Sequence, residues 1–375
     1  MKNKNILPLH GGEYDINSIK LDYSVNLNPL GLPKVISTAL KDSLYDASLY
    51  PSLHQNRLKE LLSEANNLPQ DYFFIGNGAS EAITLLAEAL SSKCSKALIV
   101  DPTFSGYERA LSARNYEIFS FSLTEDNDFG LTSDILDHIK SIENLDLVFA
   151  CSPNNPTGRA ISFDLVKEMA DTCKKLGIFL VVDECFMGFD KDKKACSCLS
   201  LIEKYDNLVL IDAFTKLFAI PGVRLGYCIS SNSKLIHKIN ELKPEWNVSS
   251  IAEATGIAIL SENRPETEKY IEQTLELIEK EKSFLTNELI KIGFIVFKSD
   301  APFLLFKLPP KLQKDGLSFY KKTAKDHGIL LRNCSNFHGL DDSYYRIAIK
   351  KHEDNIALIK ALLLVSSYCD QDTTQ

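Results

Sequence analysis

The sequence predicts an α/β fold, with a large domain in which helices sandwich a mostly parallel sheet and a smaller α+β domain beside it. Two observations support this prediction. Between about residues 80 and 226, short apolar runs alternate with amphipathic helical patterns. These runs lack strict polar–apolar alternation, which is typical of parallel strands buried on both faces. After about residue 246 the chain changes to a long charged helix followed by four short apolar runs.

The expected elements follow in chain order. Strands of the large domain are expected at residues 72–75, 97–100, 145–150, 178–182, 208–211 and 225–229. Apolar side chains at helical spacing predict helices at 80–90 and 163–176. In the second part we expect a helix at 266–292, a helix at about 317–326, and strands at 294–297, 303–307, 328–331 and 345–349. The first forty residues are too few to fold alone, so we expect a large domain at 45–245 and a composite small domain from 1–44 and 246–375.

Composition excludes several classes of function. The chain has 375 residues, with 42 Lys and Arg against 50 Asp and Glu, for a net charge of −8. An acidic chain without a basic stripe is a poor candidate for binding nucleic acid. No run approaches the roughly 18 apolar residues of a membrane span. The nine scattered cysteines favour reduced thiols in a cytoplasmic protein. Cys196 and Cys198 have no second pair nearby to complete a zinc site, so we expect no metal.

Polar residues follow the carboxyl ends of several expected strands, where open α/β sheets bind ligands. The segment Gly76-Asn77-Gly78-Ala79-Ser80 precedes a helix, so its backbone N–H groups could hold a phosphate. It is neither a dinucleotide fingerprint nor a Walker A loop, and taken alone it fits an ordinary turn equally well. Asp183 ends another strand, where a catalytic acid, a helix cap and an internal salt bridge are all open readings.

Three further residues are candidates for chemistry, although the segment around Asn155 fits a simple turn as well and a lone lysine is usually a solvated charge. Asn155 lies in the tightly specified turn Ser152-Pro153-Asn154-Asn155-Pro156-Thr157-Gly158. Lys216 stands among Phe214, Leu217 and Phe218, and such surroundings disfavour the ammonium form and favour a nucleophilic amine. Arg224 precedes a buried strand and would supply a permanent positive charge for a phosphate.

Taken together and in this order, these motifs resemble those of the fold-type-I pyridoxal-phosphate enzymes, the aspartate aminotransferase superfamily, over nearly the whole chain. The resemblance implies that Lys216 binds pyridoxal 5'-phosphate covalently and later moves protons at the substrate carbon. It implies that Asp183 pairs with the pyridine nitrogen and keeps it protonated. Further cofactor contacts are implied for Ala79, Ser80, Phe104, Asn155, Thr215 and Arg224, and for Tyr50 across the interface of a homodimer with shared active sites. Ala213 departs from the pattern, because relatives commonly carry Ser or Thr there.

Within the superfamily the sequence is similar to two families, the L-threonine-O-3-phosphate decarboxylases of cobamide synthesis and the histidinol-phosphate aminotransferases. The stretches 10–12, 24–31, 332–340 and 344–349 favour the decarboxylases, as does Phe186 where the aminotransferases usually have Tyr. The implied substrate is a small phosphorylated amino acid, O-phospho-L-threonine or O-phospho-L-serine. Its implied ligands are Arg346 for the carboxylate and Arg332 for the phosphate, with His10, Gly11, Asn28 and Asn155 assisting.

Two alternatives stay open beside decarboxylation. A rotation about one bond of the bound substrate separates decarboxylation from transamination, so residue types alone do not decide between them. A non-catalytic pyridoxal-phosphate-binding regulatory domain is the second alternative. The intact Lys216 and the absence of a basic patch in the sequence argue against it.

Overall fold

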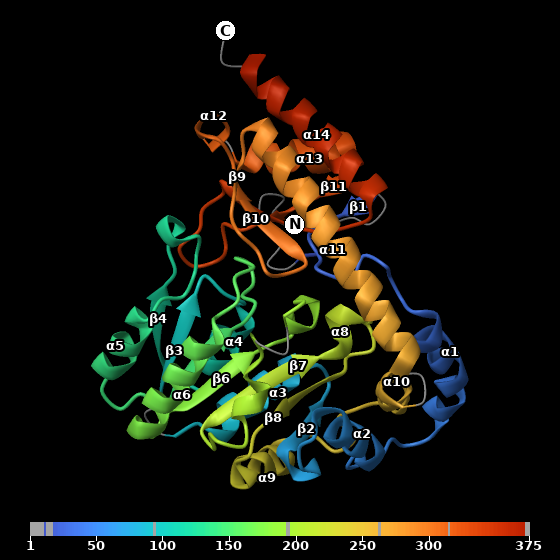
Figure 1. Cartoon of the computed structure of the whole chain (residues 1–375), viewed down its shortest axis with the longest axis vertical. Helices are drawn as coiled ribbons and strands as arrows, with labels where there is room; N and C mark the ends of the chain where they lie inside the picture. Colours follow the sequence, from blue (N-terminus) through green and yellow to red (C-terminus); the bar gives the residue numbers. More distant parts are fainter. Residues whose placement is uncertain are drawn as a thin grey trace, which may run out of the picture.

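A seven-stranded sheet lies at the centre of the larger part of the molecule in a computed structural model, which describes residues 11–12, 18–92, 95–192, 196–261, 264–313 and 316–371 (Figure 1). Its strands, in spatial order, are β2 (Phe73–Gly76), β8 (Gly226–Ile229), β7 (Leu208–Ala213), β6 (Phe179–Asp183), β5 (Leu147–Cys151), β3 (Lys96–Asp101) and β4 (Glu117–Ser122). Strand β8 is antiparallel to both of its neighbours, and the other pairs are parallel. The mostly parallel sheet expected from the sequence is therefore confirmed.

Helices cover both faces of this sheet, because its strands are apolar on both sides. In β5, the side chains of Leu147 and Phe149 pack into one apolar cluster and those of Val148 and Ala150 into another. The first cluster includes α3 (Ala79–Ala89), α4 (Gly106–Ser112) and α9 (Ser233–Leu242). The second includes α2 (Asn56–Asn66), α5 (Asp134–Ser141), α6 (Phe163–Leu176) and α10 (Ser250–Leu260). This alternation with period two places each strand between two helical layers.

A second, smaller group of strands lies at the other end of the molecule (Figure 1). Strands β12 (Arg332–Asn333), β13 (Tyr344–Ala348), β10 (Phe303–Lys307) and β9 (Ile295–Val296) form an antiparallel sheet. Strand β1 (Leu21–Asp22) pairs in parallel with β11 (Ile329–Leu330), which joins the two ends of the chain. The apolar cluster of this part includes side chains of α11 (Arg264–Ile292), α13 (Gly316–His327) and α14 (His352–Gln371).

Shorter elements connect these layers. They are α1 (Lys34–Asp42), α8 (Phe214–Leu217) and α12 (Pro310–Gln313), with 3-10 turns η1 (Ser43–Ser48), η2 (Gln70–Tyr72), η3 (Glu125–Asn127), η4 (Met187–Phe189) and η5 (Cys198–Leu201). The long helix α11 starts beside α10 and packs along α14, so it spans both parts (Figure 1). In the described part of the chain, no helix is both long and apolar enough to cross a membrane.

The sequence missed several elements. Strand β4 was not expected, and it lies at the sheet edge with a mixture of exposed and half-buried residues. The domain boundaries at 44/45 and 245/246 stay a prediction.

The close approach of β8 to the start of α3 requires glycine at position 226. A Cβ on Gly226 would lie 2.5 Å from the backbone nitrogen of Ala79 and 2.8 Å from the carbonyl carbon of Gly78. Because both obstacles are backbone atoms, we expect Gly226→Ala to lower the free energy of unfolding by about 1–3 kcal/mol, measured by urea denaturation. Gly222→Ala is the matched control, since a Cβ there meets nothing within 4 Å. Equal stability of the two variants would contradict this account.

Candidate active site

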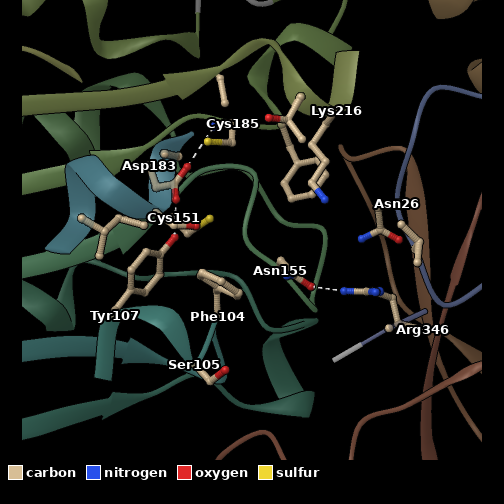
Figure 2. Close-up of a pocket in the computed structure, with 18 of the residues that line it drawn as sticks. Asn26, Phe104, Ser105, Tyr107, Cys151, Asn155, Asp183, Cys185, Lys216 and Arg346 are labelled. Atoms are coloured by element: carbon tan, nitrogen blue, oxygen red, sulfur yellow. Dashed lines mark hydrogen bonds between the residues drawn. The ribbon is translucent and has the colours of Figure 1, made fainter. Parts of the chain in front are cut away.

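A cavity of about 340 Å³ lies between the two sheets (Figure 2). The carboxyl ends of three neighbouring strands of the large sheet contribute Cys151, Asp183 and Ala213 to its wall. Strands β12 and β13 of the small sheet contribute Arg332 and Arg346 from the other side. The cavity therefore gathers polar groups from both sheets, at the edge where an open α/β sheet binds ligands.

Lys216 reaches this cavity from α8, the single helical turn that follows β7. Burial lowers the pKa of its amine to about 8, with further lowering from the positive charges of Arg346 and Arg224. The backbone N–H of Asn28 donates to the carbonyl oxygen of Lys216 at 3.1 Å. The chain thus holds a half-buried lysine that gives up its proton about two pH units more readily than an ordinary lysine, the property required of a nucleophilic amine.

Asp183 lies at the end of β6 and is buried. One carboxylate oxygen accepts from the backbone N–H of Cys185 at 3.0 Å, and the other accepts from the hydroxyl of Tyr107 at 2.7 Å. Figure 2 shows this group on the opposite side of the cavity from Arg346. Of the open readings for Asp183, its place in the cavity wall favours the functional one.

The start of α3 offers a cradle for a phosphate. Ala79 and Ser80 line the cavity beside Thr215 and Arg224, and the free N–H groups of a helix N-terminus attract anions. Gly78, with φ of +77°, precedes the helix, and a Cβ on it would lie 2.8 Å from the Arg224 guanidinium. The backbone at Gly78 and the Arg224 guanidinium therefore border the same small space, and that space fits a phosphate group. Ala213 contributes a methyl group to this wall.

The two arginines of the small sheet are cross-strand partners, since Arg332 on β12 lies opposite Arg346 on β13. Both side chains are buried. Arg346 donates to the side-chain oxygen of Asn155 and, at 2.5 Å, to the carbonyl oxygen of Ser24 (Figure 2). Burial, together with the neighbouring charge of Arg332, lowers the pKa of Arg346 to about 10. A guanidinium in such surroundings gains from an anionic ligand.

Most of the predicted site residues lie together in this cavity. Those in its wall are Gly11, Ala79, Ser80, Phe104, Asn155, Asp183, Thr215, Lys216, Arg224, Arg332 and Arg346. Gly11 packs against Ser24, whose carbonyl oxygen Arg346 contacts. Tyr50 lies outside it, with 82% of its surface exposed and its ring centroid 4.6 Å from that of Trp246. His10 lies outside the described residues.

Asn28 lies outside the cavity wall as the structure defines it. Its side-chain N–H₂ donates to the carbonyl oxygen of Leu217 and to the hydroxyl of Thr274, both at 2.7 Å. Its side-chain oxygen accepts from Leu30 N–H at 2.9 Å. These bonds tie the amide to the segment around Lys216, and its contact with a substrate stays a prediction.

Sequence reasoning also missed functional candidates. Asn26 lines the cavity, and in the amide orientation that satisfies both groups its oxygen accepts from Arg346 at 3.2 and 3.3 Å. Asn336 accepts from Arg332 at 2.7 Å. Each lies within a stretch already singled out by resemblance, but a lone Asn in a loop carries no signal of its own. Tyr107 looks like a core aromatic in the sequence. Only the structure shows that its hydroxyl donates to Asp183.

The lowered pKa of Lys216 gives the cofactor-free protein a pH-dependent stability. Its pKa is about 8 in the fold and 10.5 ordinarily, so between these values the unfolded chain binds more protons and this lysine makes stability rise with pH. We expect Lys216→Met to be more stable than the wild type at pH 7, and this advantage to shrink as the pH rises from about 8 towards 10.5. Urea unfolding of both proteins across this range measures it, and a pH-independent difference would contradict it.

Comparisons with known proteins agree with this geometry. Residues 18–362 match the model of the family "Aminotransferase class I and II". A putative threonine-phosphate decarboxylase of Caldanaerobacter subterraneus subsp. tengcongensis is 37% identical over 355 residues, covering 94% of this chain and 92% of the relative. The threonine-phosphate decarboxylase of Salmonella typhimurium is 31% identical, covering 91% and 90%. The crystal structure of the histidinol-phosphate aminotransferase from Clostridium acetobutylicum superposes with a TM-score of 0.83 and 33% identity, covering 93% and 99%. The chain belongs to the aminotransferase class I and II family, whose members have the fold-type-I architecture and use pyridoxal phosphate.

Proposed function

We propose that this chain binds pyridoxal 5'-phosphate in the cavity and decarboxylates a small O-phosphorylated amino acid. The substrate is O-phospho-L-threonine or O-phospho-L-serine, and the product is the amino-alcohol phosphate used in the nucleotide loop of cobamides. The observation that carries this proposal is the pair of buried cross-strand arginines, Arg332 and Arg346, in the same cavity as Lys216. Two guanidinium groups fit a substrate with two anionic ends, a carboxylate and a phosphate.

The residues on the large-sheet side would hold the cofactor. Arg224, Thr215 and the start of α3 would bind its phosphate, and Phe104 would cover its ring. Asp183 would face the ring nitrogen and Asn155 the ring hydroxyl, while Lys216 would bind the aldehyde carbon. When bound, pyridoxal phosphate supplies an electron sink conjugated to the substrate's α-carbon.

The chain's own residues would orient the substrate and move its proton. Arg346 would hold the carboxylate, and because Asn155 and Ser24 fix its guanidinium, that carboxylate is oriented as well as attracted. Orientation of the carboxylate relative to the cofactor plane is what separates decarboxylation from transamination. Lys216, with a pKa of about 8, would hold a proton near neutral pH and donate it to the α-carbon in place of the departing CO₂.

Transamination of histidinol phosphate is the second candidate. The observation that favours it is the 33% identity to the histidinol-phosphate aminotransferase from Clostridium acetobutylicum over 93% of this chain. Phe186 lines the cavity. It favours the decarboxylase, because it occupies a position where the aminotransferases usually have Tyr. The 37% identity to the Caldanaerobacter relative points the same way.

We further infer that the chain forms a homodimer. Large apolar side chains gather, exposed, on the segment around η1 and on Trp246, namely Leu44, Tyr45, Leu49, Tyr50, Leu53 and Trp246. An exposed apolar patch of this kind is typical of a protein interface. In the dimer, Tyr50 would reach the cofactor phosphate of the partner subunit, which accounts for its exposure in the single chain.

The reaction is tested with purified enzyme loaded with pyridoxal phosphate. We expect O-phospho-L-threonine or O-phospho-L-serine to release CO₂ in a one-to-one ratio with the amino-alcohol phosphate, in the absence of any 2-oxo acid. Gas release and phosphorus NMR of the product measure the two. Turnover of histidinol phosphate that depends on 2-oxoglutarate, without CO₂ release, would establish the second candidate instead.

Arg332→Gln provides the internal control for the substrate assignment. Loss of hydrogen bonds to one charged group should lower kcat/KM for the phosphorylated substrate by roughly 10- to 100-fold. Slow turnover of unphosphorylated L-threonine should stay unchanged, because that substrate has no phosphate to lose. An equal loss for both substrates would assign Arg332 to something other than the phosphate.

The dimer is tested by placing a charge in the apolar patch. Tyr45 is 88% exposed in the single chain, so Tyr45→Glu should leave the fold intact. It should convert the dimer to monomers, because an unpaired charge in an apolar interface is costly. Sedimentation velocity measures the mass. Leu176→Glu on α6, at a position 51% exposed, is the control and should remain dimeric. A monomeric wild type would refute the proposal.

A further inference from the structure

Tyr107 lies beneath the cavity, near the start of α4, and only 1% of its surface is exposed. Its hydroxyl donates to one oxygen of Asp183 at 2.7 Å, while Cys185 N–H donates to the other at 3.0 Å. Figure 2 shows the phenol and the carboxylate facing each other at the side of the cavity away from Arg346. Asp183 is therefore held by one donor on each of its oxygens.

We propose that Tyr107 is a positioning residue that holds the Asp183 carboxylate in place opposite the ring nitrogen of the bound cofactor. This inference rests on the cofactor site of the proposed function. It does not depend on whether the reaction is decarboxylation or transamination, because both need an electron-withdrawing ring.

The chemistry follows from the direction of the hydrogen bond. A donor that contacts a carboxylate stabilises the charged form and makes it a weaker base. A proton shared between Asp183 and a pyridine nitrogen is then displaced towards the nitrogen, which makes the ring the better electron sink. Burial and the charge of Asp183 raise the pKa of the Tyr107 phenol well above its ordinary value. Tyr107 therefore remains a donor and does not itself become charged.

Two neutral thiols lie beside the carboxylate. Cys151 and Cys185 both line the cavity near Asp183 (Figure 2). Burial raises the pKa of each thiol well above its ordinary range, so both stay neutral and neither adds a negative charge beside Asp183. The Cys185 thiol also hydrogen-bonds Asp183, so the Tyr107 hydroxyl is one of several groups that hold this carboxylate.

Packing fixes where the phenol points. The Tyr107 ring stacks on Phe149, with centroids 5.1 Å apart and planes 13° from parallel. It meets Phe104 edge-on at 5.6 Å. Between them in sequence, a Cβ on Gly106 would lie 2.2 Å from the Phe104 ring, so this turn requires glycine. The short stretch 104–107 therefore positions two side chains at once. Phe104 would cover the face of the cofactor ring, and Tyr107 holds Asp183, which would face the ring nitrogen.

The test compares Tyr107→Phe with Tyr205→Phe in the cofactor-loaded protein. Tyr205 is a matched control, because it is 1% exposed and donates to the Asp171 carboxylate at 2.9 Å, yet it lies outside the cavity wall. Each variant loses a single hydroxyl. The readout is the ¹⁵N chemical shift of pyridoxal phosphate labelled at the ring nitrogen, together with kcat and the melting temperature of the cofactor-free protein.

We expect the ¹⁵N shift in Tyr107→Phe to move towards the value of the unprotonated ring, with kcat lowered about 10- to 100-fold, as for one hydrogen bond to a charged group. Tyr205→Phe should match the wild type in the ¹⁵N shift and in kcat. A bound cofactor with an unchanged ¹⁵N shift in Tyr107→Phe would overturn the inference, even if kcat fell. So would an equal change in Tyr205→Phe. Failure of the wild type to bind the cofactor at all would instead refute the proposed function on which the inference rests.

Discussion

The hydrogen bonds of Arg346 are the contact on which the site depends. This one guanidinium lies on β13 of the small sheet, contacts Asn155 after β5 of the large sheet, and contacts Ser24 of the N-terminal segment. It thereby joins three stretches that are distant in sequence around one cavity. Its charge also lowers the pKa of Lys216. Arg346 therefore helps to hold the two sheets around the cavity and, in addition to burial, helps to lower the pKa of Lys216.

Acidic groups lie on the other side of the cavity from Arg346 (Figure 2). Asp183 accepts two hydrogen bonds at the end of β6. The adjacent Glu184 accepts from the Ser197 hydroxyl and the Cys198 N–H, although burial raises its pKa to about 7. The net charge of −8 thus describes the whole chain and conceals a locally cationic cavity. An acidic chain and a site for anions are compatible because charges act over short distances in a protein.

The sequence predicted the large sheet and the residues at its strand ends well, because both depend on local signals. Apolar runs mark buried strands, and the carboxyl ends of parallel strands meet at one edge, so Asp183, Asn155 and Lys216 had to lie near one another. Strand β4 was missed because its mixed polar and apolar residues resemble a loop. The partners of Asn28 were not foreseen, because a polar side chain in a loop gives no sign of which groups it contacts in the fold. Tyr107 was missed for the converse reason, since an aromatic side chain in an apolar pattern looks like core.

The pairing of β1 with β11 bears on the order in which the protein can be assembled. Leu21 of β1 lies opposite Ile329 of β11. Strand β1 can therefore pair only after the C-terminal part of the chain has been synthesised. Contacts of such long sequence separation form late and slowly during folding. The large sheet and Lys216 precede that partner on the ribosome, while Arg332 and Arg346 follow it. A nascent chain therefore has its lysine and the large-sheet wall of the cavity well before the arginine wall can close on them.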